Sequence, residues 1–261
     1  MVIGAGLLVL LVWVLWANTA LEVNEWRVQA EALPESFDGF RIAQVSDLHN
    51  TSNWPEAVEA LESAQPDLIV LTGDLIDSRR TDVDTALDFV RAALEIAPCY
   101  YVTGNHESRV REWHSLRQGL LEAGVTVLEN EKTVLLHGGE AITLLGLTDP
   151  DFGIDTVSAL TALTAGEEGF TILLSHRPEL MELYAASGVD LVFSGHAHGG
   201  QIRIPFLGGL VAPHQGLFPE YDEGLYRMAG TPMLVSRGIG NSIIPLRINN
   251  RPEIVVAVLV R

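Results

Sequence analysis

The alternation of predicted strands and helices in the first half of the chain constrains its fold more than any other feature. Three short apolar runs are typical of buried strands: 40–45, 67–71 and 99–102. Segments with the apolar spacing of amphipathic helices follow them: 54–64, 82–97 and 109–123. A strand–helix–strand–helix order implies parallel strands joined by crossover helices.

The second half of the chain adds strands in a different arrangement. Two strand-like runs flank Gly138-Gly139 within 125–146, which is typical of a hairpin, and a helix is predicted near 179–186. The remaining predicted strands are an edge strand at 21–33 and short strands at 170–174, 191–193, 202–204, 233–236 and 254–260. Parallel units followed by antiparallel ones indicate an α/β fold in which two sheets pack together with helices outside.

Composition and charge exclude some classes of function. The 261 residues can bury a sizeable core as one domain with a small appendage. The net charge is −18 and Lys132 is the only lysine, so the chain lacks the basic surface that non-specific nucleic-acid binding needs, and we expect no nucleic-acid partner. Cys99 is the only cysteine, so no internal disulfide can form, and its place in a predicted strand favours a buried small hydrophobic residue over a nucleophile.

The N-terminal segment 2–20 is apolar and carries no charged residue. Its length is near the lower limit for a helix that crosses the hydrocarbon core, and Trp13 and Trp16 lie where interfacial aromatic residues are common. A cleaved signal peptide would have a basic start and a small-residue cleavage site, which this segment does not show. A buried core helix would be less uniformly apolar. We therefore predict a single transmembrane anchor over 1–20 and a globular domain over 21–261, which places the protein at the cell membrane on a side that the charges do not reveal.

Polar clusters follow five of the predicted strands at the point where each strand ends. Their candidate metal-binding and catalytic residues are Asp47, His49, Asp74, Asn105, His106, His176, His196 and His198. Carboxyl ends of parallel strands are where open α/β sheets place their sites. Residues at i and i+2 of an extended chain point to the same side, so His196 and His198 can face one metal ion. We expect no ligand role for the three remaining histidines, His114, His137 and His214.

The candidate ligands offer carboxylate oxygens, an amide oxygen and imidazole nitrogens, without a thiolate. This set suits Mn, Fe, Zn or Co, among which we favour Mn, and does not suit a soft metal. Two aspartates, one asparagine and four histidines are too many ligands for one ion and about right for two. With both aspartates ionised, two divalent ions leave the site with a small positive charge, which favours an anionic substrate such as a phosphate ester.

At these residues the sequence resembles the calcineurin-like metallophosphoesterases. The matching motifs are Asp47-Leu-His49, Gly73-Asp74, Gly104-Asn105-His106-Glu107, His176 and Gly195-His196-Ala-His198, in the family's order over 41–201. The longer segments 196–201 and 236–240 resemble the branch of bacterial membrane-associated or exported phosphodiesterases. The resemblance implies a four-layer αββα sandwich of two mixed sheets flanked by helices.

The resemblance also implies how seven side chains would hold two divalent ions. The ligands of the first ion would be Asp47, His49 and His198. Those of the second would be Asn105, His176 and His196. Asp74 would bridge both ions.

Four further residues are placed by the motifs or stand beside them. His106 would bind no metal; it would stabilise the phosphoryl oxygens or protonate the leaving group. Glu107 is assigned to the start of a helix in preference to a general base. For Arg177 and Arg237, a forked contact with phosphate and a surface ion pair are both left open.

The function that we expect is a metal-dependent phosphoric ester hydrolase, and within that class a phosphodiesterase. A hydroxide that bridges the two ions would attack phosphorus in line with the leaving alcohol. The predicted anchor favours a membrane-associated substrate, such as a lipid-linked phosphate or pyrophosphate. The alternatives are a phosphomonoesterase, including a protein phosphatase, a lipid-linked pyrophosphatase, and a non-catalytic scaffold, although a scaffold would be expected to have lost some of these ligands.

Overall fold

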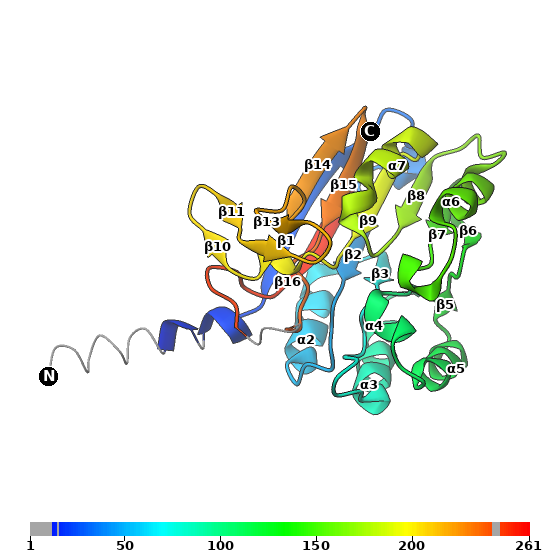
Figure 1. The fold of residues 1–261 in the computed structure, drawn as a ribbon. Helices are drawn as coiled ribbons and strands as arrows, with labels where there is room; N and C mark the ends of the chain where they lie inside the picture. Colours follow the sequence, from blue (N-terminus) through cyan, green and yellow to red (C-terminus); the bar gives the residue numbers. More distant parts are fainter. Residues whose placement is uncertain (1–11, 15, 242–245) are drawn as a thin grey trace, which may run out of the picture.

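Two six-stranded mixed sheets pack face to face in the computed structural model, which describes residues 12–14, 16–241 and 246–261 (Figure 1). The first sheet has the spatial order β1 (Glu22–Gln29), β16 (Glu253–Val260), β2 (Arg41–Val45), β3 (Leu68–Thr72), β4 (Cys99–Val102) and β5 (Thr126–Val127). The second has the order β14 (Gly224–Met228), β15 (Thr231–Val235), β9 (Leu191–Ser194), β8 (Thr171–Leu174), β7 (Glu140–Gly146) and β6 (Glu131–His137).

Helices cover the outer face of each sheet. The helices on the first sheet are α2 (Trp54–Ala64), α3 (Val83–Leu94) and α5 (Trp113–Ala123). Those on the second are α6 (Thr156–Thr164) and α7 (Met181–Ser187). One apolar cluster lies between the two sheets and one lies under each helical layer, so the predicted four-layer αββα sandwich is confirmed.

Short elements complete the fold. A one-turn helix, α4 (Asn105–Ser108), follows β4 directly. The 3-10 turns are η1 (Glu35–Phe37), η2 (Pro150–Phe152), η3 (Pro178–Leu180) and η4 (His198–Gly200). Two small hairpins, β10–β11 (Arg203–Ile204, Gly208–Gly209) and β12–β13 (Val211–Ala212, Gly216–Leu217), form a projection beside the sandwich (Figure 1).

Helix α3 illustrates how the sequence specifies these layers. The side chain of Asp82 accepts a hydrogen bond from the backbone N–H of Thr85 at 3.1 Å, which caps the first turn. Five residues at helical spacing are buried against the sheet: Ala86, Leu87, Phe89, Val90 and Ala93. The apolar stripe therefore fixes which face of the helix packs inward.

The strand register brings the carboxyl ends of both sheets to one edge of the sandwich. In the first sheet the parallel strands β2, β3 and β4 pair Val45 with Leu71 and Leu71 with Tyr101. In the second sheet β8 and β9 are parallel and pair Leu174 with Phe193. Every predicted polar cluster starts within a few residues of these strand ends, so the fold collects the clusters at one place.

Strand β14 of the second sheet and helix α6, which packs on that sheet, were not predicted. Helix α6 has the sequence TVSALTALT, whose β-branched residues have modest helix propensity, but Asp155 caps it by accepting from the backbone N–H of Ser158 at 3.4 Å. Strand β14 is an edge strand with only one buried residue, so its sequence carries little apolar signal. Strand β5, which lies in the predicted hairpin region, joins the first sheet.

The predicted membrane location is wrong. Among the described residues, no helix is long and apolar enough to cross a bilayer. Residues 1–11 and 15 of the predicted span lie outside the described part of the chain. The helical residues near the end of that span contact the domain: the amide of Asn18 bonds the backbone N and O of Arg247 at 2.7 and 3.0 Å, and the guanidinium of Arg251 lies 4.5 Å from the ring centroid of Trp16. The expectation of a lipid-linked substrate depends on that anchor and has no other support.

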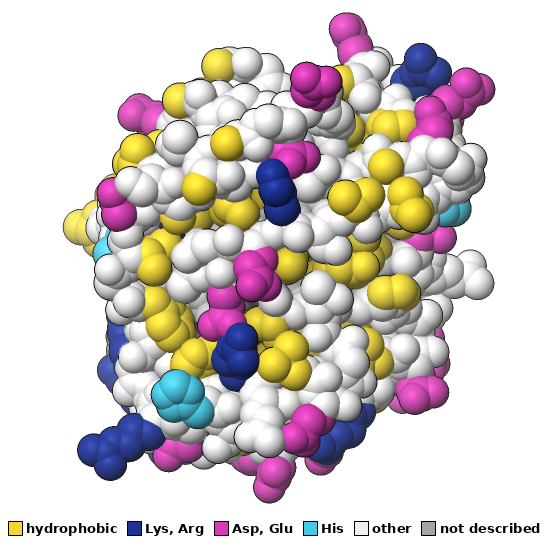
Figure 2. All heavy atoms as spheres, turned by 90° about the vertical axis from the view of Figure 1, so that its right-hand side faces the viewer, with side chains coloured by type: hydrophobic (Ala, Val, Ile, Leu, Met, Phe, Trp, Pro, Cys, Tyr) yellow, Lys and Arg dark blue, Asp and Glu magenta, His cyan; other side chains and the backbone are white. Residues whose placement is uncertain are grey.

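The surface is mixed on the face that carries α5, α6 and β6. Figure 2 shows hydrophobic side chains on this face interspersed with acidic and basic ones. The large exposed apolar residues of these three elements are Leu121, Val134, Leu136 and Val157. Scattered exposed apolar residues of this kind are ordinary for a folded domain and mark no site.

Candidate metal centre

The eight predicted site residues lie together at the shared edge of the two sheets, and all are buried. Three overlapping groups have their potential ligand atoms within 4.8 Å of one another: Asp47 with His49 and His198; His49 with Asp74 and His106; and Asp74 with His176 and His196. The Oδ2 atom of Asp74 lies 3.3 Å from His176 Nε2 and 3.6 Å from His49 Nε2. Asp74 therefore stands between His49, which follows β2 of the first sheet, and His176, which follows β8 of the second.

Backbone N–H groups orient the two carboxylates. One oxygen of Asp47 accepts from the N–H of His196 at 3.1 Å, and one oxygen of Asp74 accepts from the N–H of His106 at 2.8 Å. The other oxygen of each carboxylate faces histidines: Asp47 Oδ1 lies 3.3 Å from His198 Nε2 and has no hydrogen-bond partner among the described residues. Each aspartate is thus held through one oxygen and presents the other to the centre.

The backbone itself is unusual at these positions. Five of the eight residues have a positive φ between 45° and 66°: Asp47, His49, Asp74, His196 and His198. A non-glycine residue in the left-handed region costs on the order of 1 kcal/mol and persists only where the surroundings enforce it. Backbone hydrogen bonds from Asp47 to Gly73 and from His49 to Asp74, both 3.0 Å, enforce it here.

The imidazole nitrogens converge without forming ordinary hydrogen bonds. His49 Nε2 and His198 Nε2 face each other at 3.3 Å, and His176 Nε2 faces His196 Nδ1 at 3.1 Å. His176 Nδ1 lies 2.7 Å from the carbonyl oxygen of Thr72, so it donates there, and in the neutral ring Nε2 is the acceptor. Acceptor atoms that point at a common place fit a metal ion, because an ion satisfies several lone pairs at once.

The amide of Asn105 belongs to the same convergence. With its oxygen turned inward, Oδ1 lies 3.2 Å from His176 Nε2 and adds another acceptor to the group. With its nitrogen turned inward, the amide donates to His196 Nδ1 at 2.8 Å and to His176 Nε2 at 3.2 Å. A divalent ion at this place fits only the first orientation, because amide oxygen binds a cation and amide nitrogen does not.

Electrostatics set most of the candidate ligands in the protonation states that metal binding requires. Burial alone would raise the pKa of Asp74, but His176, His49 and His106 outweigh it and hold the pKa well below its usual value. Burial lowers the pKa of His198 to about 3. His49 and His176 differ: burial opposes their charge, but neighbouring aspartates raise the pKa of both, that of His176 to about 10. An ion that binds at a protonated ring must displace a proton.

His106 lies beside this centre with a defined tautomer. The backbone N–H of Ser78 donates to His106 Nδ1 at 3.0 Å, which places the proton of the neutral ring on Nε2. Burial lowers the pKa of His106, so the neutral ring is favoured. Nε2 lies 4.0 Å from Asp74 Oδ2, so the N–H is close to the shared carboxylate.

Glu107 is the structural residue that its motif predicts. It occupies the third position of α4, and its carboxylate accepts from the backbone N–H of Gly104 at 2.8 Å and of Asp74 at 3.0 Å. Burial raises the pKa of Glu107 to about 7. Its oxygens are thus occupied in joining the ends of β3 and β4.

Arg177 and Arg237, for which a phosphate contact and an ion pair were both considered, form ion pairs. Arg177 is 2% exposed, and it pairs with Asp149, Asp151 and Glu179. Arg237 is 7% exposed and is surrounded in the same way by three carboxylates: Glu22, Glu223 and Glu253. The ion-pair alternative therefore holds for both, although these pairs are buried and not on the surface.

Two residues of the centre's surroundings were missed in the sequence. Asp149 is buried and binds the Arg177 guanidinium through both oxygens, at 2.5 and 2.9 Å. It follows β7, so the same strand-end rule could have found it. His214 lies against His196 with ring centroids 5.1 Å apart, although we expected no role for it; it comes from a loop whose path the sequence does not reveal.

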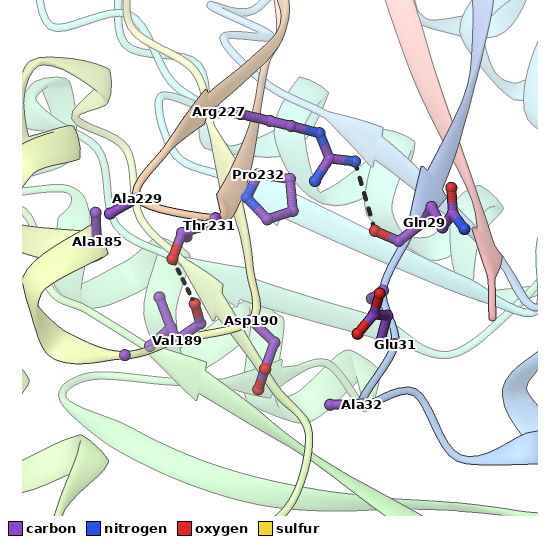
Figure 3. Close-up of a pocket in the computed structure, with 13 residues that line it drawn as sticks. Gln29, Glu31, Ala32, Ala185, Val189, Asp190, Arg227, Ala229, Thr231 and Pro232 are labelled. Carbon is purple, nitrogen blue, oxygen red and sulfur yellow. Dashed lines mark hydrogen bonds between the residues drawn. The ribbon is translucent and has the colours of Figure 1, made fainter.

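A cavity of about 750 Å³ lies elsewhere, at the opposite end of the second sheet (Figure 3). Its lining includes Arg227, which donates to the carbonyl of Gln29 at 3.4 Å, and Thr231, which donates to that of Val189 at 3.0 Å. Of its two acidic residues, Glu31 and Asp190, the second already accepts from the backbone and hydroxyl of Thr171. The described lining offers no convergent set of free ligand atoms, so size does not make this cavity the candidate site.

Comparison with known proteins identifies the family. A family model described as calcineurin-like phosphoesterase matches residues 40–200. The chain is 32% identical to the uncharacterized metallophosphoesterase YkuE of Bacillus subtilis (strain 168), over 92% of this chain and 85% of that protein. It is 30% identical to the phosphodiesterase YaeI of Escherichia coli (strain K12), over 85% and 82%. It is also 30% identical to a Danio rerio transmembrane protein with a metallophosphoesterase domain, but spans only 57% of that protein's length.

Solved structures agree on the fold. The NAD nucleotidase NadN of Haemophilus influenzae superposes with a TM-score of 0.55 at 16% identity, over 77% of this chain and 45% of that one. The phosphopantetheinyl hydrolase PptH of Mycobacterium tuberculosis superposes with a TM-score of 0.53 at 14% identity, over 78% and 91%. With the family match across 40–200 and His/Asp groups that could hold metal at its centre, this chain belongs to the calcineurin-like metallophosphoesterases.

Proposed function

We propose that residues 21–261 form a phosphodiesterase whose centre holds two divalent metal ions. The observation that carries this proposal is the position of Asp74, whose Oδ2 atom faces His49 on one side and His176 on the other. The first ion would be held by Asp47, His49 and His198. The second would be held by Asn105, His176 and His196. Asp74 would serve both, and the oxygen and nitrogen donors favour manganese.

Two ions held in this way would act as Lewis acids on a phosphoryl oxygen and lower the pKa of a bound water. The protein's part is to hold the ligands in the required states. The carboxylates of Asp47 and Asp74 stay ionised because neighbouring histidines lower their pKa values. Burial keeps His196 and His198 neutral, so their inward nitrogens are free to bind.

His106 would act by donating a hydrogen bond. Because the N–H of Ser78 occupies its Nδ1, the neutral ring offers only its Nε2–H to a substrate. Releasing that proton would create an imidazolate, whereas donating it in a hydrogen bond to a phosphoryl or leaving oxygen needs no charge change. Of the two roles considered for His106, this geometry supports stabilisation of developing negative charge over proton transfer.

A diester suits the site better than a monoester. A phosphate monoester brings a second negative charge, which needs a further cation for its recognition. The two buried arginines nearest in sequence to the motifs, Arg177 and Arg237, are each surrounded by three carboxylates and are not free to supply it. The similarity to a protein named as a phosphodiesterase supports the same choice.

The test is hydrolysis of bis-p-nitrophenyl phosphate and of p-nitrophenyl phosphate by the full chain, first stripped of metal and then supplied with Mn²⁺. We expect metal-dependent turnover with kcat/KM at least about 10-fold higher for the diester, a difference of roughly 1.4 kcal/mol. His106→Gln should lower kcat by about 10²–10³ without loss of bound metal. His114→Gln, which changes an exposed histidine of α5, is the matched control and should leave kcat unchanged.

A preference for the monoester would overturn the choice of substrate class and leave a metal-dependent hydrolase. Absence of turnover on either ester with both ions bound would overturn the proposal that the centre is a general phosphodiesterase.

A further inference from the structure

His214 connects the projecting hairpins to the metal centre. It lies in the turn between β12 and β13, and its ring stacks on that of His196 at an interplanar angle of 28°. His214 Nδ1 lies 2.9 Å from His196 Nε2. The other nitrogen of His196, Nδ1, faces His176 Nε2 at 3.1 Å. One nitrogen of His196 therefore points into the proposed metal centre and the other points at His214.

Arg177 determines which of the two facing nitrogens carries the proton. Its Nη1 lies 2.6 Å from His214 Nδ1, closer than to Nε2 of the same ring at 3.2 Å. A guanidinium has only donors, and Arg177 Nη1 lies closer to His214 Nδ1, at 2.6 Å, than to His196 Nε2, at 3.2 Å. His214 Nδ1 is therefore the acceptor, shared by Arg177 and His196. The proton between the two rings then belongs to His196 Nε2, and His196 Nδ1 is left bare toward the centre.

The same arginine argues against a third metal ion. Glu179, His196 and His214 have potential ligand atoms within 4.8 Å of one another and could in principle hold a cation. Arg177 Nη1 already lies among them, 3.5 Å from Glu179 Oε1 and 3.2 Å from His196 Nε2. The guanidinium occupies the place of a cation, so this group supports the second ion's ligand and is not a separate site.

The backbone conformation of His214 also indicates that its side chain has a role at the proposed metal centre. Its φ is +59°, in the left-handed region where glycine and asparagine are the usual residues. The turn is held by Gln215, whose side chain donates to the carbonyl of Tyr221 at 2.8 Å and accepts from its N–H at 2.9 Å. A histidine in this conformation, with 47% of its side chain exposed, has an energetic cost that its contact with His196 would offset.

We propose that His214 is a positioning residue for the second metal ion: it accepts the Nε2 proton of His196 and so fixes the tautomer and ring orientation that present Nδ1 to the ion. This inference rests on the proposed metal centre and adds to it a residue outside every motif of the chain. Partners that accept the outer N–H of a metal-bound histidine typically contribute about 10–100-fold to metal affinity.

The test compares His214→Gly and His214→Asn in the full chain by calorimetric titration of the metal-free protein with Mn²⁺. Both substitutions suit a positive φ, so both should fold with thermal stability at least equal to that of the wild type. Glycine removes the acceptor, and we expect the affinity for the second ion to fall about 10–100-fold while the first is unchanged. Asparagine keeps a carbonyl acceptor, and we expect it to stay within about 3-fold of the wild type, on the same scale of outer-partner effects.

Ala229→Gly is the matched control, because Ala229 also has a positive φ (50°) and lies in the β14–β15 turn, at the opposite end of the second sheet from the metal centre. It should leave both affinities unchanged. Equal affinities in His214→Gly and the wild type would overturn the proposal, and so would an equal loss in the glycine and asparagine variants. The titration uses no substrate, so its result does not depend on whether the chain hydrolyses diesters. A wild type that binds fewer than two ions would overturn both this proposal and the proposed two-metal centre.

Discussion

Replacing Gly104 by alanine tests how closely the two strand ends that carry the site approach each other. A Cβ at this position would lie 2.5 Å from the backbone nitrogen of Asp74 and 2.8 Å from its Cγ, whereas ordinary contact begins at 3.4 Å. Gly104 has φ −104° and ψ −175°, which any residue adopts, so the substitution introduces a steric conflict and no backbone strain. The ends of β3 and β4 would have to separate by roughly 1 Å, and overpacking of this kind typically destabilises by about 1–3 kcal/mol.

This destabilisation corresponds to a fall in Tm of about 2–4 °C per kcal/mol in a domain of this size. The movement would also displace the Asp74 carboxylate, and because a ligand set must be held within about 0.5 Å, we expect metal affinity to fall at least about 10-fold. Calorimetric melting of the metal-free chain and titration with Mn²⁺ measure the two effects separately.

Gly169→Ala is the control, since nothing lies within 4 Å of a Cβ there and its φ lies outside the left-handed region. It should change the free energy of unfolding by no more than about 0.5 kcal/mol. The reasoning fails if Gly104→Ala melts and binds metal like the wild type, because the strand ends would then be farther apart than the structure places them.

Two further predictions concern buried groups that are not proposed metal ligands. Burial raises the pKa of Cys99 to about 12, so at pH 8 its thiolate population should be about 10³ lower than that of an ordinary thiol. Iodoacetamide should therefore label Cys99 far more slowly in the native chain than in the urea-unfolded chain. Equal labelling rates would contradict the burial of Cys99. Asp149→Asn removes the carboxylate that binds the Arg177 guanidinium through both oxygens, and urea unfolding should show a loss of about 3–5 kcal/mol. Asp88→Asn breaks an exposed pair with Arg91 and should cost less than about 1 kcal/mol, so similar losses in the two variants would contradict the buried network.

The strand-end residues could be predicted from the sequence because two simple rules apply to them. Apolar runs of strand length alternate with helical spacing, which predicts parallel strands, and parallel strands collect their carboxyl ends at one edge. The structure places His176 and His196 of the second sheet beside Asp74 of the first at that edge. Asp149 obeys the same rule and was missed only because the end of the hairpin that precedes it was not considered.

His214 could not be found in this way. Its turn is fixed by a side-chain contact between Gln215 and Tyr221 and by the path of two short hairpins, none of which has an apolar period. Helix α6 was missed for a related reason, because its threonine-rich sequence is stabilised by a cap and by packing and not by strong helix propensity. The end of the N-terminal segment was misread because composition alone does not show that Asn18 bonds the backbone of Arg247.

The number of metal ions that each chain binds tests the central claim most directly. The metal-free full chain would be dialysed to equilibrium against Mn²⁺, and the bound metal measured by atomic emission beside Asp74→Asn. We predict two ions per chain in the wild type and fewer in the variant, because Asp74 Oδ2 faces ligands of both proposed ions. A wild type that binds no more than one ion, or an Asp74→Asn variant that binds two with unchanged affinity, would contradict the account.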